Sequence, residues 1–109
     1  MNQAELQKLV EEISLQYFHV PFKHEVKINN RMTTTGGRYF LKDHHIDING
    51  HFLEKKYHAD LVGIIKHELT HYHLHLAGRG YQHRNRDFKN LLAAVGGNRY
   101  TPDIGLRRR

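Results

Sequence analysis

The chain has no cysteine among its 109 residues. Disulfide bonds, thiolate metal ligands and a cysteine nucleophile are therefore excluded within this sequence, and their absence fits a reducing compartment. No apolar stretch approaches the roughly 18 residues that a membrane-spanning helix requires. Residues 1–7 are polar and contain no basic segment followed by an apolar run, so we expect no signal peptide. These absences predict a soluble, cytoplasmic protein without a membrane partner.

Internal repeats and low-complexity segments are also missing from the sequence. A chain of this length supports one hydrophobic core but not two. From residue 98 onward the sequence loses its hydrophobic periodicity and ends in three arginines. We therefore expect one domain over residues 1–97, followed by a basic, loose tail over residues 98–109.

Three segments carry the apolar spacing of amphipathic helices. The first starts near Asn2, which can form a capping box with Glu5, and ends before Pro21. The second should run from about His58 to about Ala77, where glycines follow. The third contains Phe88, Leu91, Leu92 and Val95 and is ended by two glycines, Gly96 and Gly97. The spacing thus predicts an N-terminal helix, a long central helix and a C-terminal helix.

Between the first two helices the sequence favours short strands. Residues 25–29 alternate polar and apolar side chains, and residues 38–41 and 45–49 are two further short segments of this kind. Their turn-rich connections and the Asn49-Gly50 pair favour a small antiparallel sheet. Together with the three helices, this sheet predicts an α+β fold.

The clearest chemical signal is an HExxH motif, His67-Glu68-Leu69-Thr70-His71, in the middle of the central helix. Histidines at i and i+4 lie one turn apart on the same helix face, so both imidazoles can reach one cation. Glu68 can point at the open side of that cation and take a proton from a water held there. The motif predicts one Zn²⁺ ion, with His67 and His71 as ligands and Glu68 as the catalytic base.

A catalytic zinc usually has three protein ligands. His75 lies about 12 Å along the helix axis from His67, and His73 is rotated by about 200° from His71, so both are expected to be packing or surface residues. His83 follows the glycines that end the helix, and a reversed chain could return it to the ion. We expect His83 as the third ligand, with Asp87 as the alternative.

The run from His67 to Phe88 closely resembles the SprT-like family, which is related to the Spartan DNA-dependent proteases. Gly37-Arg38-Tyr39 and residues 46–49 extend the likeness over most of the chain. The resemblance implies a compact zincin-like core with His67, His71 and His83 as ligands and Glu68 as the catalytic glutamate. It also implies that Phe88 is the aromatic residue after the third ligand. In Spartan relatives it implies cleavage of proteins crosslinked to DNA.

One feature departs from the family pattern. Many SprT-like proteins carry a cysteine-rich zinc ribbon after the protease core, and this chain has no cysteine. The ribbon is either naturally missing or lost by truncation, so DNA contact would have to come from the basic surface. The chain has 17 Lys and Arg against 11 Asp and Glu, a formal charge of +6, which attracts phosphates. The candidates for phosphate contact are Arg79, Arg84, Arg86, Arg107, Arg108 and Arg109.

These features leave several functions open. The favoured one is a zinc endopeptidase acting on a protein or peptide substrate, with DNA as a further expected partner. The alternative is a zinc-stabilised basic domain that binds nucleic acid or a regulatory partner and does not cut. A hydrolase with a non-protein substrate ranks last. The same arginines could instead be ordinary solvated side chains, or could bind an acidic segment of a protein substrate.

Overall fold

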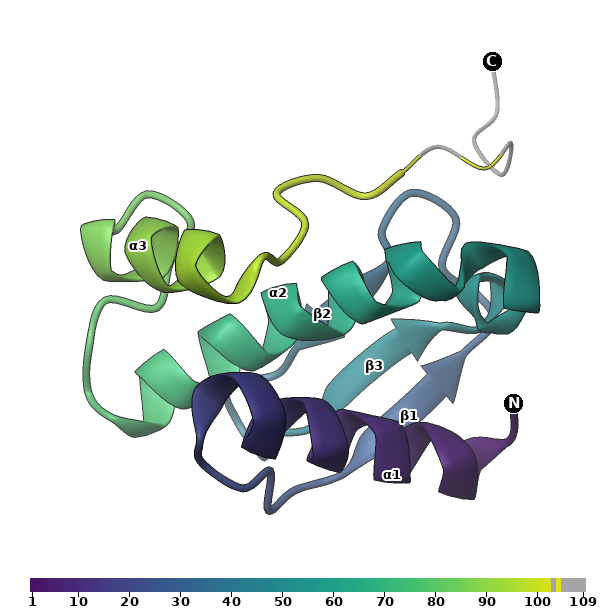
Figure 1. The fold of residues 1–109 in the computed structure, drawn as a ribbon, viewed down its shortest axis with the longest axis horizontal. Helices are drawn as coiled ribbons and strands as arrows, with labels where there is room; N and C mark the ends of the chain where they lie inside the picture. The colour runs from purple at the N-terminus through teal and green to yellow at the C-terminus, as the bar shows by residue number, and fades with distance from the viewer. Residues whose placement is uncertain (103, 105–109) are drawn as a thin grey trace.

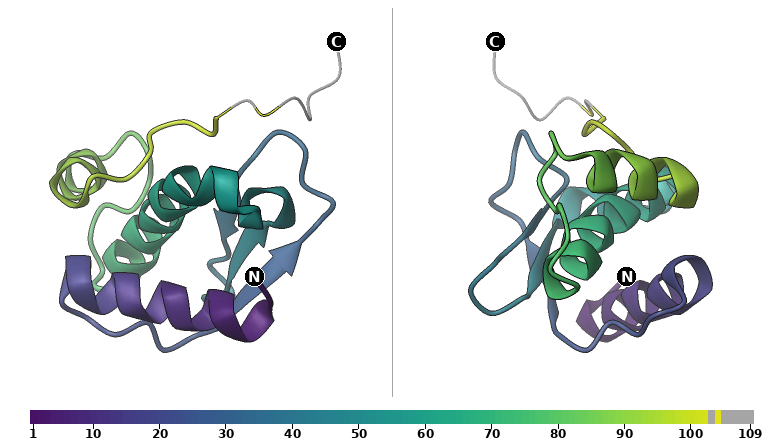
Figure 2. Two further views of the ribbon diagram at one scale, coloured as in Figure 1. Left: turned by 45° about the vertical axis from the view of Figure 1, so that its right-hand side comes forward. Right: turned by 90° about the vertical axis from the view of Figure 1, so that its left-hand side faces the viewer.

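Helices α1 and α2 cover one face of a three-stranded sheet in the computed structural model, which describes residues 1–102 and 104 (Figure 1). Helix α3 packs on the side of α2 that faces away from α1 (Figure 2). The helices and strands of this α+β fold are α1 (Gln3–Ile13), β1 (Val26–Asn29), β2 (Gly37–Tyr39), β3 (Ile46–Asn49), α2 (His58–Leu76) and α3 (Arg86–Val95). A π-helical turn, Ser14–Phe18, extends α1, and two 3-10 turns, Gly50–Leu53 and Lys55–Tyr57, lead into α2.

The predicted start of the first helix is confirmed. The Asn2 side chain accepts a hydrogen bond of 2.9 Å from the Glu5 amide, and the Glu5 side chain accepts one of 2.9 Å from the Asn2 amide. This capping box satisfies amides that would otherwise lack partners in the first turn. His19 then adopts a left-handed conformation with φ of 60° and ends the helical run before Pro21.

The sheet differs from the prediction of an antiparallel arrangement, because it is mixed. Strand β3 lies in the centre, parallel to β1 and antiparallel to β2. The chain leaves β1, skips one strand position to form β2 and then returns to fill the gap. Asn49 fixes this connection, since its side-chain amide donates to the carbonyls of Met32 and Thr35 at 3.2 and 3.0 Å. Alternation identifies a strand but does not specify which strand lies next to it.

The core lies between the helices and the sheet. Leu6 and Val10 of α1, Ile46 and Ile48 of β3, and Leu69 of α2 are almost completely buried there. A second, smaller cluster joins α2 to α3 through Leu74, Phe88 and Leu92. Helix α2 contributes to both clusters and so connects the main core to α3. No helix in the described part of the chain is long and apolar enough to cross a bilayer.

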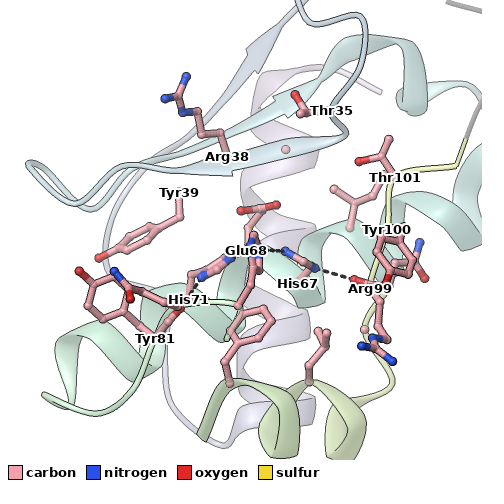
Figure 3. Close-up of a pocket in the computed structure, with 18 of the residues that line it drawn as sticks. Thr35, Arg38, Tyr39, His67, Glu68, His71, Tyr81, Arg99, Tyr100 and Thr101 are labelled. Carbon is pink, nitrogen blue, oxygen red and sulfur yellow. Dashed lines mark hydrogen bonds between the residues drawn. The ribbon is translucent and has the colours of Figure 1, made fainter. Parts of the chain in front are cut away.

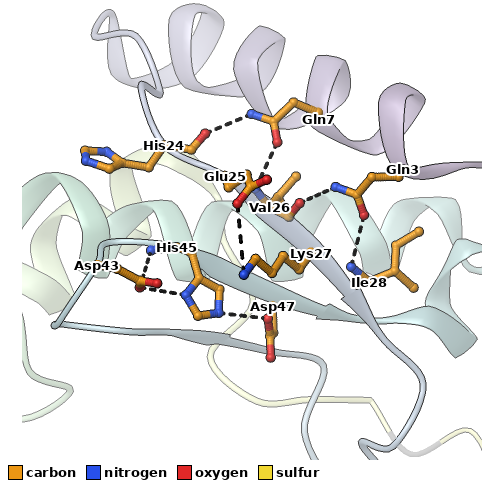
Figure 4. Close-up of polar contacts among 10 residues, drawn as sticks. All are labelled: Gln3, Gln7, His24, Glu25, Val26, Lys27, Ile28, Asp43, His45 and Asp47. Carbon is orange, nitrogen blue, oxygen red and sulfur yellow. Dashed lines mark hydrogen bonds and ion pairs between the residues drawn. The ribbon is translucent and has the colours of Figure 1, made fainter.

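The outer edge of β1 is covered by side chains of α1 (Figure 4). Gln7 accepts a hydrogen bond from the Val26 amide and donates one to the His24 carbonyl, both at 2.9 Å. Gln3, one turn earlier, donates to the Val26 carbonyl and accepts from the Ile28 amide. The two glutamine amides thus satisfy backbone groups of an edge strand that would otherwise be free to pair with another chain.

Residues 98–101, which the sequence suggested would be part of a loose tail, contact the core. The Asn98 amide donates to the Gly63 carbonyl of α2 at 3.0 Å, and Thr101 Oγ accepts from the Gly36 amide at 2.9 Å. The chain after α3 therefore runs back alongside α2 (Figure 1). Arg107, Arg108 and Arg109 lie outside the described residues.

His73 fixes the junction of α2 with the end of the first helical segment. Its Nε2 lies 2.7 Å from Ser14 Oγ, and Ser14 Oγ donates to the Val20 carbonyl at 2.5 Å. The serine proton is thus engaged, so His73 Nε2–H is the donor between the two side chains. Burial lowers the pKa of His73 to about 4, which keeps the ring neutral in the folded protein.

We expect the stability of the metal-free protein to fall as the pH is lowered from about 6.5 to about 4. In this window an unfolded chain binds a proton at His73, whose ordinary pKa is 6.5, whereas the folded chain does not. Urea unfolding in the presence of a chelator should therefore show a flatter dependence on pH for His73→Gln. His58→Gln, at the exposed start of α2, controls for the loss of one histidine. An unchanged slope for His73→Gln would contradict the assignment.

Candidate metal centre

Three histidines converge at the middle of α2. His67 and His71 project from successive turns of the helix, and His83 comes from the loop between α2 and α3. The Nε2 atom of His83 lies 3.0 Å from the Nε2 atoms of both His67 and His71. All three ligand atoms lie within 4.8 Å of one another, so this cluster could hold a metal ion. The predicted return of His83 toward the helix pair is therefore observed.

The hydrogen bonds of the other ring nitrogens determine the tautomers of the helical pair. His67 Nδ1 lies 2.5 Å from the carbonyl oxygen of Asn98, and His71 Nδ1 lies 2.6 Å from that of Tyr81 (Figure 3). A carbonyl oxygen can only accept, so each Nδ1 carries the proton and donates it. The neutral rings therefore present Nε2 lone pairs toward the centre of the cluster, as metal ligands do.

The residues fit a zinc ion. With Zn–N bonds of roughly 2.0–2.1 Å, the nitrogens of a tetrahedral site lie roughly 3.3 Å apart. His83 is 3.0 Å from each helical histidine and can donate its single Nε2 proton to only one lone pair in full. A cation would resolve this competition, because with the His83 proton on Nδ1 it could accept all three Nε2 lone pairs at once. Imidazole nitrogens are ligands that Zn²⁺ prefers, although other divalent transition metals also accept them.

Burial keeps the two helical ligands unprotonated. It lowers the pKa of His71 to about 4, and it also lowers the pKa of His67. The carbonyl of Asn98 partly offsets the effect on His67, while the nearby His83 adds to it. A metal ligand must be the neutral imidazole, so these shifts favour the form that binds.

Phe88 forms the floor of the cluster. Its ring stacks on His71 at 4.4 Å between centroids and lies 5.3 Å from His67 and 5.1 Å from His83. Phe88 belongs to α3 and is 3% exposed, so its ring excludes water from one side of the three imidazoles. The aromatic residue that the resemblance placed after the third ligand thus touches all three rings.

The loop after α2 explains why His83 rather than Asp87 joins the cluster. Gly78, with φ of 68°, reverses the chain, and the Arg79 amide closes the turn onto the Leu74 carbonyl at 2.9 Å. Asp87 is occupied elsewhere, because its carboxylate accepts hydrogen bonds of 3.0 Å from the Gly80 amide and from the Arg79 side chain. These donors also lower its pKa. Asp87 therefore stabilises the loop and does not belong to the cluster.

His73 and His75 take no part in the cluster, as the helix geometry predicted. His73 contacts Ser14, and the Nδ1 atom of His75 lies 2.6 Å from the hydroxyl of Tyr39. The same hydroxyl lies 2.7 Å from His44 Nδ1. Tyr39 has its pKa raised to about 12, chiefly by burial, so it remains a neutral phenol that links α2 to the strand connection.

Glu68 lies beside the cluster and points toward β2, with His67 and His71 on either side (Figure 3). Its side chain is buried, and burial raises its pKa to about 8. The backbone of Tyr39 acts in the opposite direction and lowers it in part. A β-carbon on Gly37 would lie 2.9 Å from Glu68 Cγ, so the glycine leaves room for the carboxylate. In the metal-free protein Glu68 is therefore mostly a neutral carboxylic acid near pH 7.

A cleft of about 1320 Å³ opens over the histidine cluster and Glu68. One wall comes from β2 and the loop before it, including Thr35 and Tyr39, and the other comes from α3 and residues 96–101. The cleft is larger than the 300–1,000 Å³ typical of small-molecule pockets.

Comparison with known proteins identifies the family of this chain. A model of the SprT-like family matches residues 6–106. The chain belongs to the SprT-like family. Its SprT-like relatives include the Protein SprT-like of Bacillus cereus strain B4264, 58% identical over 92% of this chain, and that of Bacillus anthracis strain CDC 684, 54% identical over the same share. The aligned region covers 66% of each relative's length. No solved structure matches the chain.

Two functional groups of this SprT-like chain could not be recognised from side-chain chemistry. The carbonyls of Tyr81 and Asn98, which orient His71 and His67, are backbone groups that any residue could supply. Gly96 and Gly97, the glycines after α3, were the one feature of the sequence that could have indicated the return of the chain to α2. In the sequence they indicated only a helix stop, whereas a tight turn there also returns the chain to α2.

The arginine candidates fall into separate groups. Arg79 is paired with Asp87, whereas the side chains of Arg84 and Arg86 are exposed next to His83. Lys89, one turn after Arg86 on α3, is also exposed and lines the cleft. Lys89 therefore belongs to the cleft wall, whereas Arg84 and Arg86 are exposed but are not among the residues that line the cleft.

Replacing His83 should separate the two candidate third ligands. We expect His83→Ala to lose more metal affinity than the roughly 10–100-fold that follows loss of an outer-shell partner, because it removes a ligand outright. Asp87→Asn should retain nearly wild-type affinity, since the Asp87 carboxylate is hydrogen-bonded to Arg79 and Gly80 and lies outside the histidine cluster. Zn²⁺ titration in competition with a chromophoric chelator measures both. A greater loss for Asp87→Asn would make the carboxylate the ligand.

Proposed function

We propose that this SprT-like chain is a zinc-dependent metalloprotease that hydrolyses peptide bonds with Glu68 as the general base. The observation that carries the proposal is the pairing of a buried carboxyl group of raised pKa with three converging imidazoles beside an open cleft. A site that only stabilised the fold would need neither the carboxylate nor the cleft. A cytoplasmic location is part of the same proposal.

The roles of the residues follow from their positions. His67, His71 and His83 would hold the ion, which when bound lowers the pKa of a water and polarises the substrate carbonyl. Glu68 would take the proton of the attacking water on its carboxylate and pass it to the leaving amide nitrogen. Burial raises the pKa of this carboxyl group to about 8 in the metal-free protein, and a bound cation would lower it again and so favour the carboxylate that accepts the proton.

The edge of the sheet supports a polypeptide substrate. Strand β2 pairs with β3 on one side only, through the Gly36 carbonyl and the Phe40 amide among others. Alternation along an antiparallel strand turns the backbone groups of Gly37 and Tyr39 to the other side, where the cleft lies, and there the Tyr39 amide already meets Glu68. An extended chain could therefore be positioned by main-chain hydrogen bonds with little demand on its sequence.

Glu68→Gln should abolish proteolysis while leaving zinc binding intact. Loss of a general base costs about 10²–10⁴-fold, and the amide retains the shape of the side chain without its basicity. Cleavage of an unfolded, basic protein by the zinc-loaded enzyme measures the effect, with Glu12→Gln on the exposed face of α1 as the matched control. Equal cleavage by Glu68→Gln and the wild type would refute the role of Glu68.

We also propose that DNA-associated proteins are among the substrates, because exposed basic residues flank the cleft. The alternative, a zinc-stabilised domain that binds nucleic acid without cutting, rests on the same charge of +6. The alternative requires DNA binding in a protein that cleaves nothing and for which Glu68 is dispensable. The protease proposal requires cleavage, with DNA increasing it.

The double variant Arg84→Ala/Arg86→Ala should bind DNA more weakly than the wild type. Its affinity should also depend less steeply on salt concentration. For every phosphate that the protein no longer neutralises, the slope of log affinity against log salt falls by about 0.9 on duplex DNA. Arg79→Ala is the control, because Arg79 is engaged with Asp87 at 3.0 Å. Fluorescence anisotropy at several salt concentrations measures the slope. If the double variant has the same slope as the wild type, these arginines do not belong to the interface.

A further inference from the structure

The segment after α3 places one backbone carbonyl against the histidine cluster. Gly96, with φ of 73°, ends α3, and the Gly97 amide closes the turn onto the Leu92 carbonyl at 3.1 Å. The next residue, Asn98, meets α2. Its amide donates to the Gly63 carbonyl at 3.0 Å, and its own carbonyl accepts the His67 Nδ1–H at 2.5 Å.

Both of these backbone hydrogen bonds of Asn98 are made with a single turn of α2. Gly63 and His67 are four residues apart, so the Gly63 carbonyl belongs to the same hydrogen-bonded turn as the His67 backbone. Asn98 therefore bridges the backbone of that turn to the side chain at its end. The bond to Gly63 fixes the position of Asn98 on α2. The Asn98 carbonyl in turn sets the direction of the His67 ring, so this direction depends on how closely Asn98 approaches the helix.

Asn98 can approach α2 this closely because two positions, Gly63 and Gly97, are glycines. A β-carbon at Gly63 would lie 2.2 Å from Asn98 Oδ1 and 2.4 Å from Asn98 Cγ. A β-carbon at Gly97 would lie 2.4 Å from Leu92 Cδ1 and 3.3 Å from the His67 amide nitrogen. Both distances at Gly63 are below any normal carbon contact, so a larger residue there must displace the Asn98 side chain, which is packed against this turn of α2.

We propose that Asn98 is a positioning residue for His67 and that Gly63 is the position on α2 that admits it. Through its carbonyl, Asn98 holds the His67 proton on Nδ1 and leaves the Nε2 lone pair for the ion. The inference rests on the metal site of the proposed function, but it concerns the orientation of a ligand and not the chemistry of Glu68. Loss of such an outer-shell partner typically costs 10–100-fold in metal affinity.

The test uses Gly63→Ala in the full chain. We expect the affinity for Zn²⁺, measured by chelator competition, to fall by about 10–100-fold. In the metal-free variant, ¹⁵N–¹H correlation spectra of the His67 ring should show a mixture of tautomers in place of a single Nδ1–H form. A purely structural role for Gly63 would lower stability without moving this spectroscopic signature.

A second substitution gives the rescue. Asn98→Ala keeps the backbone carbonyl and removes the side-chain atoms that the new methyl group would meet. Gly63→Ala/Asn98→Ala should recover most of the affinity lost by Gly63→Ala. If Gly63→Ala does not fold, Asn98→Pro removes the amide that donates to Gly63 and should give the same loss and the same tautomer mixture.

A folded Gly63→Ala, or in its place Asn98→Pro, with wild-type zinc affinity and a single Nδ1–H tautomer would overturn the proposal. Failure of the double variant to recover affinity would also count against it, because the clash with the Asn98 side chain would not be the cause. If the wild-type chain bound no zinc, the proposed metal site would fail. The tautomer measurement on metal-free protein would still decide the role of Asn98.

Discussion

Two hydrogen bonds from histidine Nδ1 atoms to backbone carbonyls determine the chemistry of this site. They fix the protons of His67 and His71 on the far side of each ring and so direct both Nε2 lone pairs to one point, where His83 also arrives. Burial supports this arrangement by lowering the pKa of both rings. Without the carbonyls, two imidazoles one turn apart on a helix would be free to rotate or to take the other tautomer.

Both carbonyls, and His83 itself, come from the segment that surrounds α3. Tyr81 and His83 precede the helix and Asn98 follows it, while Phe88 within it lies under all three rings. Helix α3 also packs on α2 through a small apolar cluster. A metal ion bound to His83 would therefore connect this segment to the core, so ion binding and docking of α3 stabilise each other. The cleft is formed by the same docking.

The second constraint is the close packing of α2 on the edge of the sheet. A β-carbon on Gly36 would lie 2.5 Å from Ile64 Cδ1, and one on Gly37 would lie 2.9 Å from Glu68 Cγ. The strand can approach the helix only because both residues lack side chains. This approach buries Glu68 and raises its pKa to about 8, so the backbone packing of β2 sets the basicity of the residue proposed as the general base.

The sequence by itself determined the three helices, the three strands and the histidine pair on one helix face, because these follow from local periodicity, capping and the spacing of side chains on one helix. It also favoured His83 over Asp87, through the glycines that reverse the chain. Only the tertiary structure decided that β3 lies between β1 and β2, since alternation does not choose a strand's neighbour. The same holds for the return of Asn98 to α2. Its contribution is a backbone carbonyl, which every residue carries, so its role depends on where the fold places it.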